Sequence, residues 1–399
     1  MVKNSALVKL GAAIVVCGAA IWGATQVLDQ SRHVTLAVYG LLFLAAACLV
    51  AVFRGRARDA ALVCAAVLFG LFALEAVAQR GSPSGSVYRD KGVSSPRADL
   101  GWGPARAGVF HEKRIAADGA VAYDVAYTID ESLTRKVISD PNGPTIAFFG
   151  DSFTFGSGVS DSDTLPQSFA DLTGRRLRVL NLAVGGYSPQ QFLRTLEVGA
   201  HDALLRERPR LFVMLTAPFH ASRTACKASF SWLAPSYALE NGEAVYRGPC
   251  AARASGITSA LRAVFGETEL FRYFFAREQP VDQNDMDLYL AILIKAGKLA
   301  REKYAVPTLI LYLPYDFSDR GYRLGPGYEK DDIIGKLREG GLTVLDASLD
   351  MKANRIQDLF RVGDGHPTGL ANRIWAGQVR DYVASHLAAV LGDGSGSIR

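Results

Sequence analysis

The sequence has few of the residues that hold metal ions. Its 399 residues include only six His and five Cys, the histidines are not clustered, and no Cys-x-x-Cys pair occurs. Structural zinc sites are built from closely spaced Cys and His ligands. We therefore expect neither a metal site nor a bound cofactor.

A basic domain is also lacking. Residues 1–80 hold seven Lys or Arg and three Asp or Glu, out of 44 and 39 in the whole chain. The rest of the chain then carries 37 basic and 36 acidic residues and is nearly neutral. Domains that bind nucleic acid are usually strongly basic. We therefore expect no nucleic-acid partner.

Charged residues are missing from three runs near the N-terminus. Residues 10–28 and 34–53 carry none, and a third run, 60–74, extends to 79 if Glu75 is tolerated near one end. A helix of about 20 apolar residues crosses a bilayer core of about 30 Å. We expect three transmembrane helices in a membrane region spanning 1–80. Buried helices of a soluble domain, or a cleaved signal peptide at the first run, are the alternatives.

The basic residues set the orientation of these helices. Arg54, Arg56 and Arg58 lie between the second and third runs, and Lys3 and Lys9 lie at the N-terminus. Basic loops stay on the cytoplasmic side of a membrane. Three crossings would then place everything after about residue 80 outside. In a bacterium this predicts an inner-membrane protein with a periplasmic or extracytoplasmic domain.

The cysteines agree with this orientation. Cys17, Cys48 and Cys64 lie in the apolar runs, where a cysteine is usually a small apolar residue. Only Cys226 and Cys250 fall in the exported part. A cysteine pair in an oxidising compartment favours a disulfide over two free thiols. We expect Cys226 and Cys250 to be bonded to each other.

Composition divides the exported part into segments. Residues 81–98 are rich in Gly, Ser and Pro and are typical of a linker. The segments "LGWGPARAGVF" and "VAYDVAYTID" predict a β extension within 99–144. Residues 217–280 are too long for a plain connection and predict a loop-rich insertion. The final residues, 392–399, are expected to be a disordered tail.

A regular alternation of strands and helices begins at Thr145. Helical patterns separate five short apolar runs, at 145–149, 178–183, 210–216, 307–313 and 342–347. Such alternation favours right-handed crossovers and a parallel sheet covered on both faces. The sequence therefore predicts an α/β fold with a five-stranded parallel sheet, over a main domain spanning 99–391.

Polar residues follow the predicted strands at the edge where doubly wound sheets bind ligands. Ser152, in "GDS", follows the first strand, and Gly186, in "VGGYSPQQ", follows the second. "TAPFHASR" follows the third, and "VGDGHPTG", with Asp364 and His366, precedes the last helix. We expect these segments to converge on one site.

These residue types suit nucleophilic catalysis. A serine hydroxyl needs a base to take its proton, and His366 is placed to do so for Ser152. A carboxylate such as Asp364 would fix the imidazole tautomer. An oxyanion hole needs backbone N–H donors, and Ser152 and Gly186 are the candidates. Each segment alone is compatible with a helix cap or a surface turn, and their combination favours the catalytic interpretation.

Three segments resemble a known family. "FFGDSFTFG", "NLAVGGYSPQQ" and "GDGHPTG" are similar to the first, second and fifth blocks of the SGNH, or GDSL, hydrolases, over about 145–390. The resemblance implies a flavodoxin-like three-layer α/β/α fold. It also implies Ser152 as nucleophile, Gly186 as second-block oxyanion donor and His366 as base. Some membrane-anchored bacterial members carry a segment similar to 100–129.

Two departures from the family pattern concern the site. The third block normally supplies an Asn that donates to the oxyanion, and Pro218, which has no N–H, lies near that position. Thr216 or His220 is a possible third donor, with a structural role for His220 as the alternative.

The second departure is the position of the acid. The family's acid usually lies three residues before the histidine, where this chain has Gly363. Asp364 lies two residues before His366, and Asp358, or no acid at all, is the alternative.

The sequence as a whole predicts a membrane-integral serine hydrolase of ester bonds. Its expected substrate is an acylated small molecule, glycan or lipid outside the cytoplasm, which it would deacylate. One alternative is an O-acyltransferase of envelope polysaccharide, with a membrane acyl donor as partner. Another is a non-catalytic glycan-binding module with a degenerate site. Reactivity of Ser152 separates the enzymes from the binding module.

Overall fold

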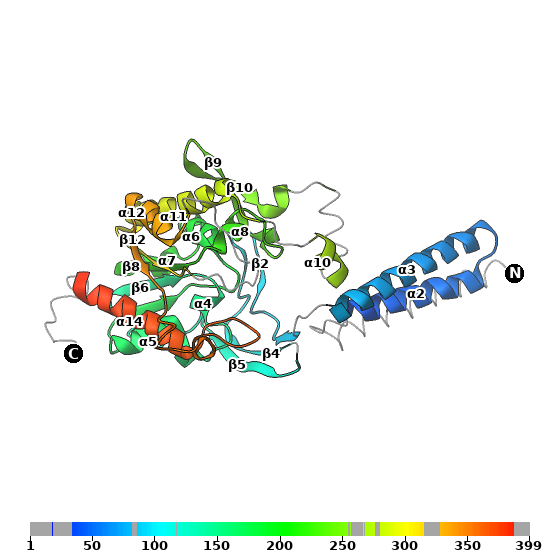
Figure 1. Ribbon diagram of the computed structural model, residues 1–399, viewed down its shortest axis with the longest axis horizontal. Helices are drawn as coiled ribbons and strands as arrows, with labels where there is room; N and C mark the ends of the chain where they lie inside the picture. Colours follow the sequence, from blue (N-terminus) through cyan, green and yellow to red (C-terminus); the bar gives the residue numbers. More distant parts are fainter. Residues whose placement is uncertain are drawn as a thin grey trace. The chain divides into compact units, whose positions relative to one another are not determined.

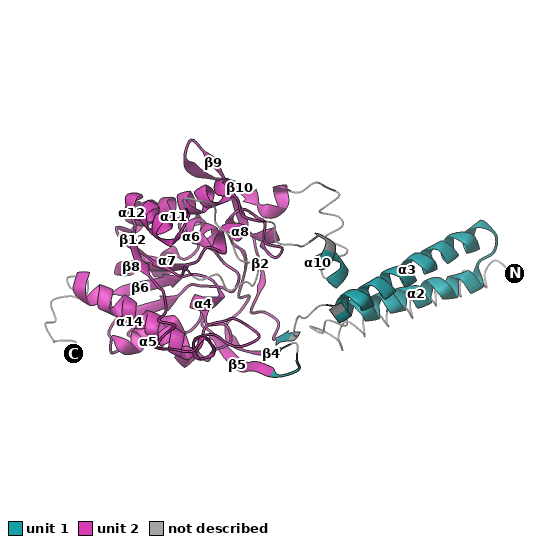
Figure 2. Cartoon of the chain, in the orientation of Figure 1, with its two compact units in different colours: residues 1–88, 115–120, 255–277 teal, residues 89–114, 121–254, 278–399 magenta. Residues whose placement is uncertain are grey.

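The computed structural model describes residues 18, 34–81, 86–116, 118–253, 256, 266, 268–275, 280–314 and 328–386. Contacts divide the chain into two compact units, which Figure 2 shows in different colours. Unit 1 comprises residues 1–88, 115–120 and 255–277. Unit 2 comprises residues 89–114, 121–254 and 278–399. Unit 2 carries the predicted α/β domain.

Unit 1 contains two long apolar helices, α2 (Val34–Val52) and α3 (Arg56–Gly81), which lie side by side (Figure 1). Both are long and apolar enough to cross a membrane. They correspond to the second and third predicted spans. Among the residues that the structure describes there are two such apolar helices. The first predicted span, 10–28, lies outside the described residues except for Gly18.

The end of α3 is joined to a helix from the predicted insertion. Helix α10 (Glu269–Phe275) begins at the buried carboxylate of Glu75. That carboxylate accepts hydrogen bonds from the backbone N–H groups of Glu269 and Leu270, both at 2.9 Å. Such bonds satisfy donors that a helix N-terminus leaves open. Part of the 217–280 segment therefore belongs to unit 1.

Unit 2 is built on a five-stranded sheet in the order β12-β11-β8-β6-β7, and every neighbouring pair is parallel. This confirms the predicted α/β fold class and its strands. The strands are β6 (Thr145–Phe149), β7 (Arg178–Asn181), β8 (Pro209–Thr216), β11 (Thr308–Tyr312) and β12 (Thr343–Asp346).

Helices cover both faces of this sheet (Figure 1). Alternate residues of β6 point to opposite faces, so Ala147 and Phe149 join one core while Ile146 and Phe148 join the other. Both sets are apolar because both faces are buried. The first core contains α6 (Pro189–Val198), α11 (Gln283–Tyr304) and α12 (Lys330–Glu339), and the second contains α5 (Leu165–Leu172) and α14 (Gly369–His386).

Among the described residues, five short strands precede the sheet, and the last three of them lie within 99–144, the range of the predicted β extension. They are β1 (Ser86–Arg89), β2 (Ser95–Arg97), β3 (Gly101–Gly103), β4 (Gly108–Ile115) and β5 (Val121–Ile129). Within the expected linker, 81–98, the structure has two of these strands, so that expectation was wrong for residues 86–97. Strand β2 pairs antiparallel with β3 despite its proline. Pairing with a partner strand therefore outweighs a Gly, Ser and Pro composition.

The insertion after β8 begins with α8 (His220–Thr224) and continues into a hairpin of β9 (Pro235–Glu240) and β10 (Glu243–Pro249). Cys226 and Cys250 form the expected disulfide, with Cα atoms 5.6 Å apart. The remaining short elements are α4 (Ser152–Phe155), η1 (Asp161–Asp163), α7 (Asp202–Leu205), η2 (Ser231–Leu233), η3 (Cys250–Arg253) and α13 (Ile356–Leu359). The predicted tail, 392–399, lies outside the described residues.

Candidate active site

The candidate site lies at the carboxyl end of β6. The strand order reverses there, because β7 lies on one side of β6 and β8 on the other. Open parallel sheets bind ligands at such a switch point. All five residues of β6 are buried, so its end is held firmly in the sheet. The polar segments after β6, β7 and β8 leave the sheet at this edge.

Ser152 opens the short helix α4 directly after β6. Gly150 precedes it with φ +154°, and a Cβ there would lie 2.3 Å from Thr154 Oγ1, so only glycine fits. The carboxylate of Asp151 accepts a hydrogen bond from the Phe153 N–H at 2.9 Å and caps the helix. The Ser152 N–H donates no hydrogen bond to any described residue. It is therefore free to bind an anion.

A glycine turn lies beside Ser152. Tyr187 N–H donates to the carbonyl oxygen of Val184 at 3.0 Å, and Gly186 takes φ +83°. A Cβ on Gly185 would lie 4.0 Å from the Ser152 Cβ. Within the described part of the chain, the Gly186 N–H also has no hydrogen-bond acceptor. The structure thus brings the two predicted oxyanion donors to neighbouring turns.

His366 lies in the loop before α14 and is paired with Asp364. Its Nδ1 is 2.7 Å from Asp364 Oδ2, and Arg114 Nε is 2.9 Å from the other carboxylate oxygen. Burial alone would raise the pKa of Asp364, but the hydrogen bond from His366 and the charge of Arg114 lower it. An ionised Asp364 orders the imidazole with its proton on Nδ1, which leaves Nε2 to accept a proton.

The alternative acid is directed elsewhere. Asp358 pairs with Arg355 at 2.9 Å, and 37% of its side chain is exposed. Two-residue spacing in the glycine-containing loop is therefore sufficient to bring Asp364 to the ring of His366. Arg114 was not foreseen from the sequence, because 250 positions separate it from Asp364 and no local pattern connects them.

Phe153 connects the base to the nucleophile segment. Its ring packs edge-on against the ring of His366 with centroids 5.8 Å apart, and Phe153 follows Ser152 directly. No hydrogen bond joins the hydroxyl of Ser152 to His366 among the described contacts. Catalytic hydrogen bonds in sites without substrate are often long and shorten when substrate binds. The structure therefore brings the two segments together without a closed Ser–His contact.

Asp151 begins a buried polar chain that runs beneath Ser152. Its Oδ2 is 3.1 Å from His220 Nε2, His220 Nδ1 is 2.9 Å from Thr216 Oγ1, and that oxygen is 2.9 Å from the hydroxyl of Tyr289. Burial lowers the pKa of His220 to about 4, so its ring is neutral at pH 7. Burial would raise the pKa of Asp151, but its hydrogen bond with His220, the charge of Arg223 and the hydrogen bond from the Phe153 N–H hold that pKa well below its usual range.

This chain accounts for both proposed third donors. A neutral His220 has one N–H, which Asp151 accepts, so its Nδ1 accepts the proton of Thr216. Both side chains are fully buried. In this arrangement neither has an N–H or O–H left for a ligand. The position of His220 fits the structural role that the sequence left open.

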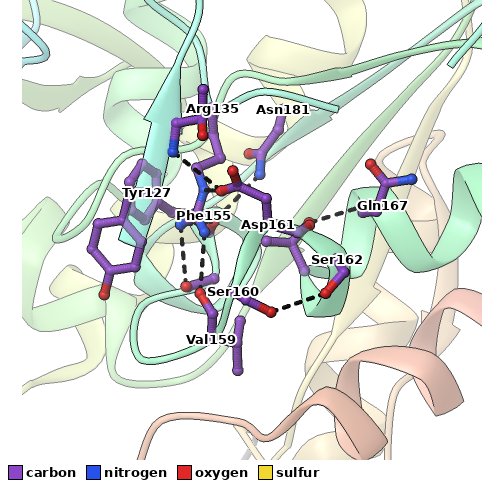
Figure 3. A network of polar contacts seen from close by, with 12 residues as sticks. Tyr127, Arg135, Phe155, Val159, Ser160, Asp161, Ser162, Gln167 and Asn181 are labelled. Atoms are coloured by element: carbon purple, nitrogen blue, oxygen red, sulfur yellow. Dashed lines mark hydrogen bonds and ion pairs between the residues drawn. The ribbon is translucent and has the colours of Figure 1, made fainter. Parts of the chain in front are cut away.

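A second buried network holds the segment after α4. Figure 3 shows the Arg135 guanidinium, which is fully buried, surrounded by backbone carbonyl oxygens. It donates to Phe155 at 3.2 Å, to Gly156 at 3.3 Å and to Val159 at 3.1 Å, and its Nε is 2.8 Å from Asp161. A buried charge satisfied on every side fixes a single conformation of the chain around it. Arg135 therefore holds the far end of the Ser152 turn in place.

No protein-family model matches the chain, and no curated protein matches it. Similar solved structures include two GDSL-family lipolytic proteins. The one from Desulfitobacterium hafniense is 11% identical, covers 60% of this chain and 99% of its own, and has a TM-score of 0.33. The one from Veillonella parvula is 14% identical, covers 61% of this chain and 100% of its own, and has a TM-score of 0.35. Another similar structure is the psychrotrophic esterase EstA from Pseudoalteromonas sp., which is 12% identical, covers 61% of this chain and 98% of its own, and has a TM-score of 0.34. Others among the similar structures are described as SGNH hydrolases.

Proposed function

We propose that this chain is a serine hydrolase acting on ester bonds, with Ser152 as nucleophile, His366 as base and Asp364 as its acid. The observation that carries the proposal is the meeting of these groups at the end of β6. A serine at a helix N-terminus lies beside two open backbone N–H groups and next to a Phe153 ring that contacts the His366–Asp364 pair. These are the parts that acyl transfer requires.

The reaction follows from those roles. Ser152 Oγ bonds to the ester carbonyl carbon while its proton passes to His366 Nε2, and the carbonyl π electrons move to oxygen. The N–H groups of Ser152 and Gly186 donate to that oxyanion. The electron pair then returns and expels the alcohol, which takes the proton from His366. Water repeats both steps on the acyl-serine and releases the acid.

We assign the substrate to an acylated glycan or lipid outside the cytoplasm. Helices α2 and α3 support anchoring in a membrane, and the Cys226–Cys250 disulfide supports an oxidising compartment. An acyl-serine can also be attacked by a sugar hydroxyl in place of water. An O-acyltransferase would therefore use the same residues and differ only in the acceptor.

The test is labelling of the full-length protein with a fluorophosphonate, read by intact mass, beside turnover of aryl esters of increasing acyl length. We expect one adduct on the wild type and on Ser162→Ala, a control in the exposed η1 turn, and none on Ser152→Ala. An adduct retained in Ser152→Ala would refute the nucleophile. A wild type that is inert but binds an acylated glycan would favour the binding module. Added glycan that captures the acyl group would identify a transferase.

A further inference from the structure

Arg223 bridges the two turns of the candidate site. It lies on α8, in the segment after β8 where the expected Asn is missing. Its Nη1 is 3.0 Å from Asp151 Oδ2 and 2.9 Å from the carbonyl oxygen of Tyr187. Asp151 directly precedes Ser152, and Tyr187 directly follows Gly186. The guanidinium therefore touches the neighbours of both backbone donors.

The guanidinium is held in one orientation. Its Cζ lies 4.8 Å from the ring centroid of Phe219 and 5.3 Å from that of Phe230. Stacking on aromatic rings fixes the plane of an arginine head, and two hydrogen bonds at one nitrogen fix its rotation within that plane. A donor positioned in advance stabilises developing charge more than one that must reorganise.

Part of this cation remains open to a ligand. Arginine carries five N–H groups, and the two on Nη1 are directed at Asp151 and Tyr187. Nε and Nη2 donate to none of the described residues, and 15% of the side chain is exposed. Because neither nitrogen is buried without a hydrogen-bond partner, both reach solvent. Three donors of a fixed cation thus lie open beside the Ser152 and Gly186 turns.

We propose, building on the proposed function, that Arg223 is the third oxyanion donor, in place of the missing third-block Asn. When Ser152 Oγ bonds to the carbonyl carbon and the π electrons pass to oxygen, an N–H of Arg223 donates to that oxygen and keeps its proton. The earlier candidates, Thr216 and His220, have no donor left. A cationic donor also opposes the charge that builds up in the transition state.

Three variants of the full-length protein test this role. Arg223→Gln should lower kcat for a neutral aryl ester by about 10²- to 10³-fold with little change in KM, because the donor acts in the transition state. Arg223→Lys, which keeps a charge but loses the planar head, should fall between Gln and the wild type. Arg194→Gln is the matched control, since Arg194 is 17% exposed, pairs with Asp99 and stacks 3.7 Å from the centroid of Tyr246. It should stay within twofold of the wild type.

Chemical rescue separates a donor from a structural residue. Guanidinium ion at tens of millimolar, with sodium chloride as the ionic-strength control, should restore rate to Arg223→Ala and not to Arg194→Ala. An unchanged kcat in Arg223→Gln would overturn the proposal. Loss of rate together with a lowered Tm and no rescue would also overturn it. Ser157 is buried, and its Oγ lies 4.0 Å from the Cβ position of Gly185. A comparable kcat loss in Ser157→Ala, with Arg223→Gln unaffected, would give the role to that hydroxyl.

The rate of phosphonylation of the same variants is a second measurement that does not depend on ester turnover. Phosphonylation of Ser152 also builds negative charge on an oxygen in the hole, so its rate should fall in Arg223→Gln. If the wild type is phosphonylated but hydrolyses no ester, the assignment of substrate fails while Arg223 is still tested. If Ser152 is not phosphonylated at all, the proposed function fails and the role of Arg223 fails with it.

Discussion

The two halves of the candidate site are held in different ways. The turn that carries Ser152 rests on buried groups, since Asp151, His220 and the side chain of Arg135 are all fully enclosed. The loop that carries His366 is open, and Val362 within it is 76% exposed. The proposed nucleophile and oxyanion donors are thus fixed by the protein interior, whereas the proposed base lies in an otherwise exposed loop and is held by one buried carboxylate, that of Asp364. Substitutions in the two halves should therefore change activity and stability in different ways.

The largest expected effect spans both halves. Ser152→Ala and His366→Ala should each lower kcat by roughly 10⁶-fold, and the double variant should be little worse, because the two residues act in one step. Initial rates on an aryl ester, with Tm recorded for each variant, measure this. Losses that add in the double variant would contradict the shared mechanism.

The next prediction concerns the open half. Asp364→Asn should lower kcat by about 10²- to 10⁴-fold, because the imidazole loses the carboxylate that selects its tautomer. The pH dependence of the rate should change as well. Asp358→Asn is the matched control, since Asp358 pairs with Arg355 rather than with His366. Equal losses in the two variants would show that Asp364 does not act through the histidine.

The sequence predicted the strands and the residues that follow them better than the contacts that hold those residues in place. The strands follow from local apolar patterns, the disulfide from the presence of only two cysteines in the exported part, and the pairing of Asp364 with His366 from their separation by two residues. The linker prediction failed at β1 and β2, because composition does not reveal that a short segment has a partner strand. The sequence also did not reveal that Thr216 and His220 pair with each other and that His220 pairs with Asp151.

Contacts between distant residues explain what the sequence did not reveal. Arg114 is 250 positions from Asp364, and Arg223 is 72 positions from Asp151. Arg135 gives no local signal of burial, since its partners are three backbone carbonyl oxygens and the carboxylate of Asp161, 26 positions away. A single sequence shows which residues end each strand, but pairings of this kind depend on how the layers pack.

The third prediction concerns the disulfide, which lies at the edge of the buried half. The disulfide lies just beyond α8, because Cys226 is three residues after Arg223. A Cys226→Ser, Cys250→Ser double variant should lose about 3 kcal/mol of unfolding free energy in the chain-entropy model, while most of kcat is retained below the unfolding transition.

Chemical denaturation of the full-length protein in detergent measures this loss. Cys48→Ser with Cys64→Ser is the control, because both thiols are free and exposed on the apolar helices. A collapse of kcat in the folded double variant would show that the disulfide, rather than the Asp151 contacts, positions α8.

The effect expected to be smallest at pH 7 is a pH dependence of stability, to which His220 in the buried half contributes. Burial lowers the pKa of His220 to about 4, and the pKa of His201 is also lowered to about 4. Unfolding exposes each ring to water, where its pKa returns to about 6.5. The unfolded chain then binds more protons than the folded chain between these values, so stability rises with pH. The contribution is complete above pH 6.5 and is lost as the pH falls toward 4.

Each of these two histidines should therefore lower the free energy of unfolding by about 1.4 kcal/mol for each pH unit that the pH falls within that window. Urea unfolding of the full-length protein at intervals from pH 7 to pH 4 measures the slope. His220→Gln should reduce the slope by one proton, whatever it does to the stability at pH 7. His111→Gln, at an exposed position on β4, should leave the slope unchanged. An unchanged slope in His220→Gln would mean that the ring of His220 carries its proton in the folded state, as a charged partner of Asp151. The buried half would then rest on an ion pair rather than on a neutral hydrogen bond.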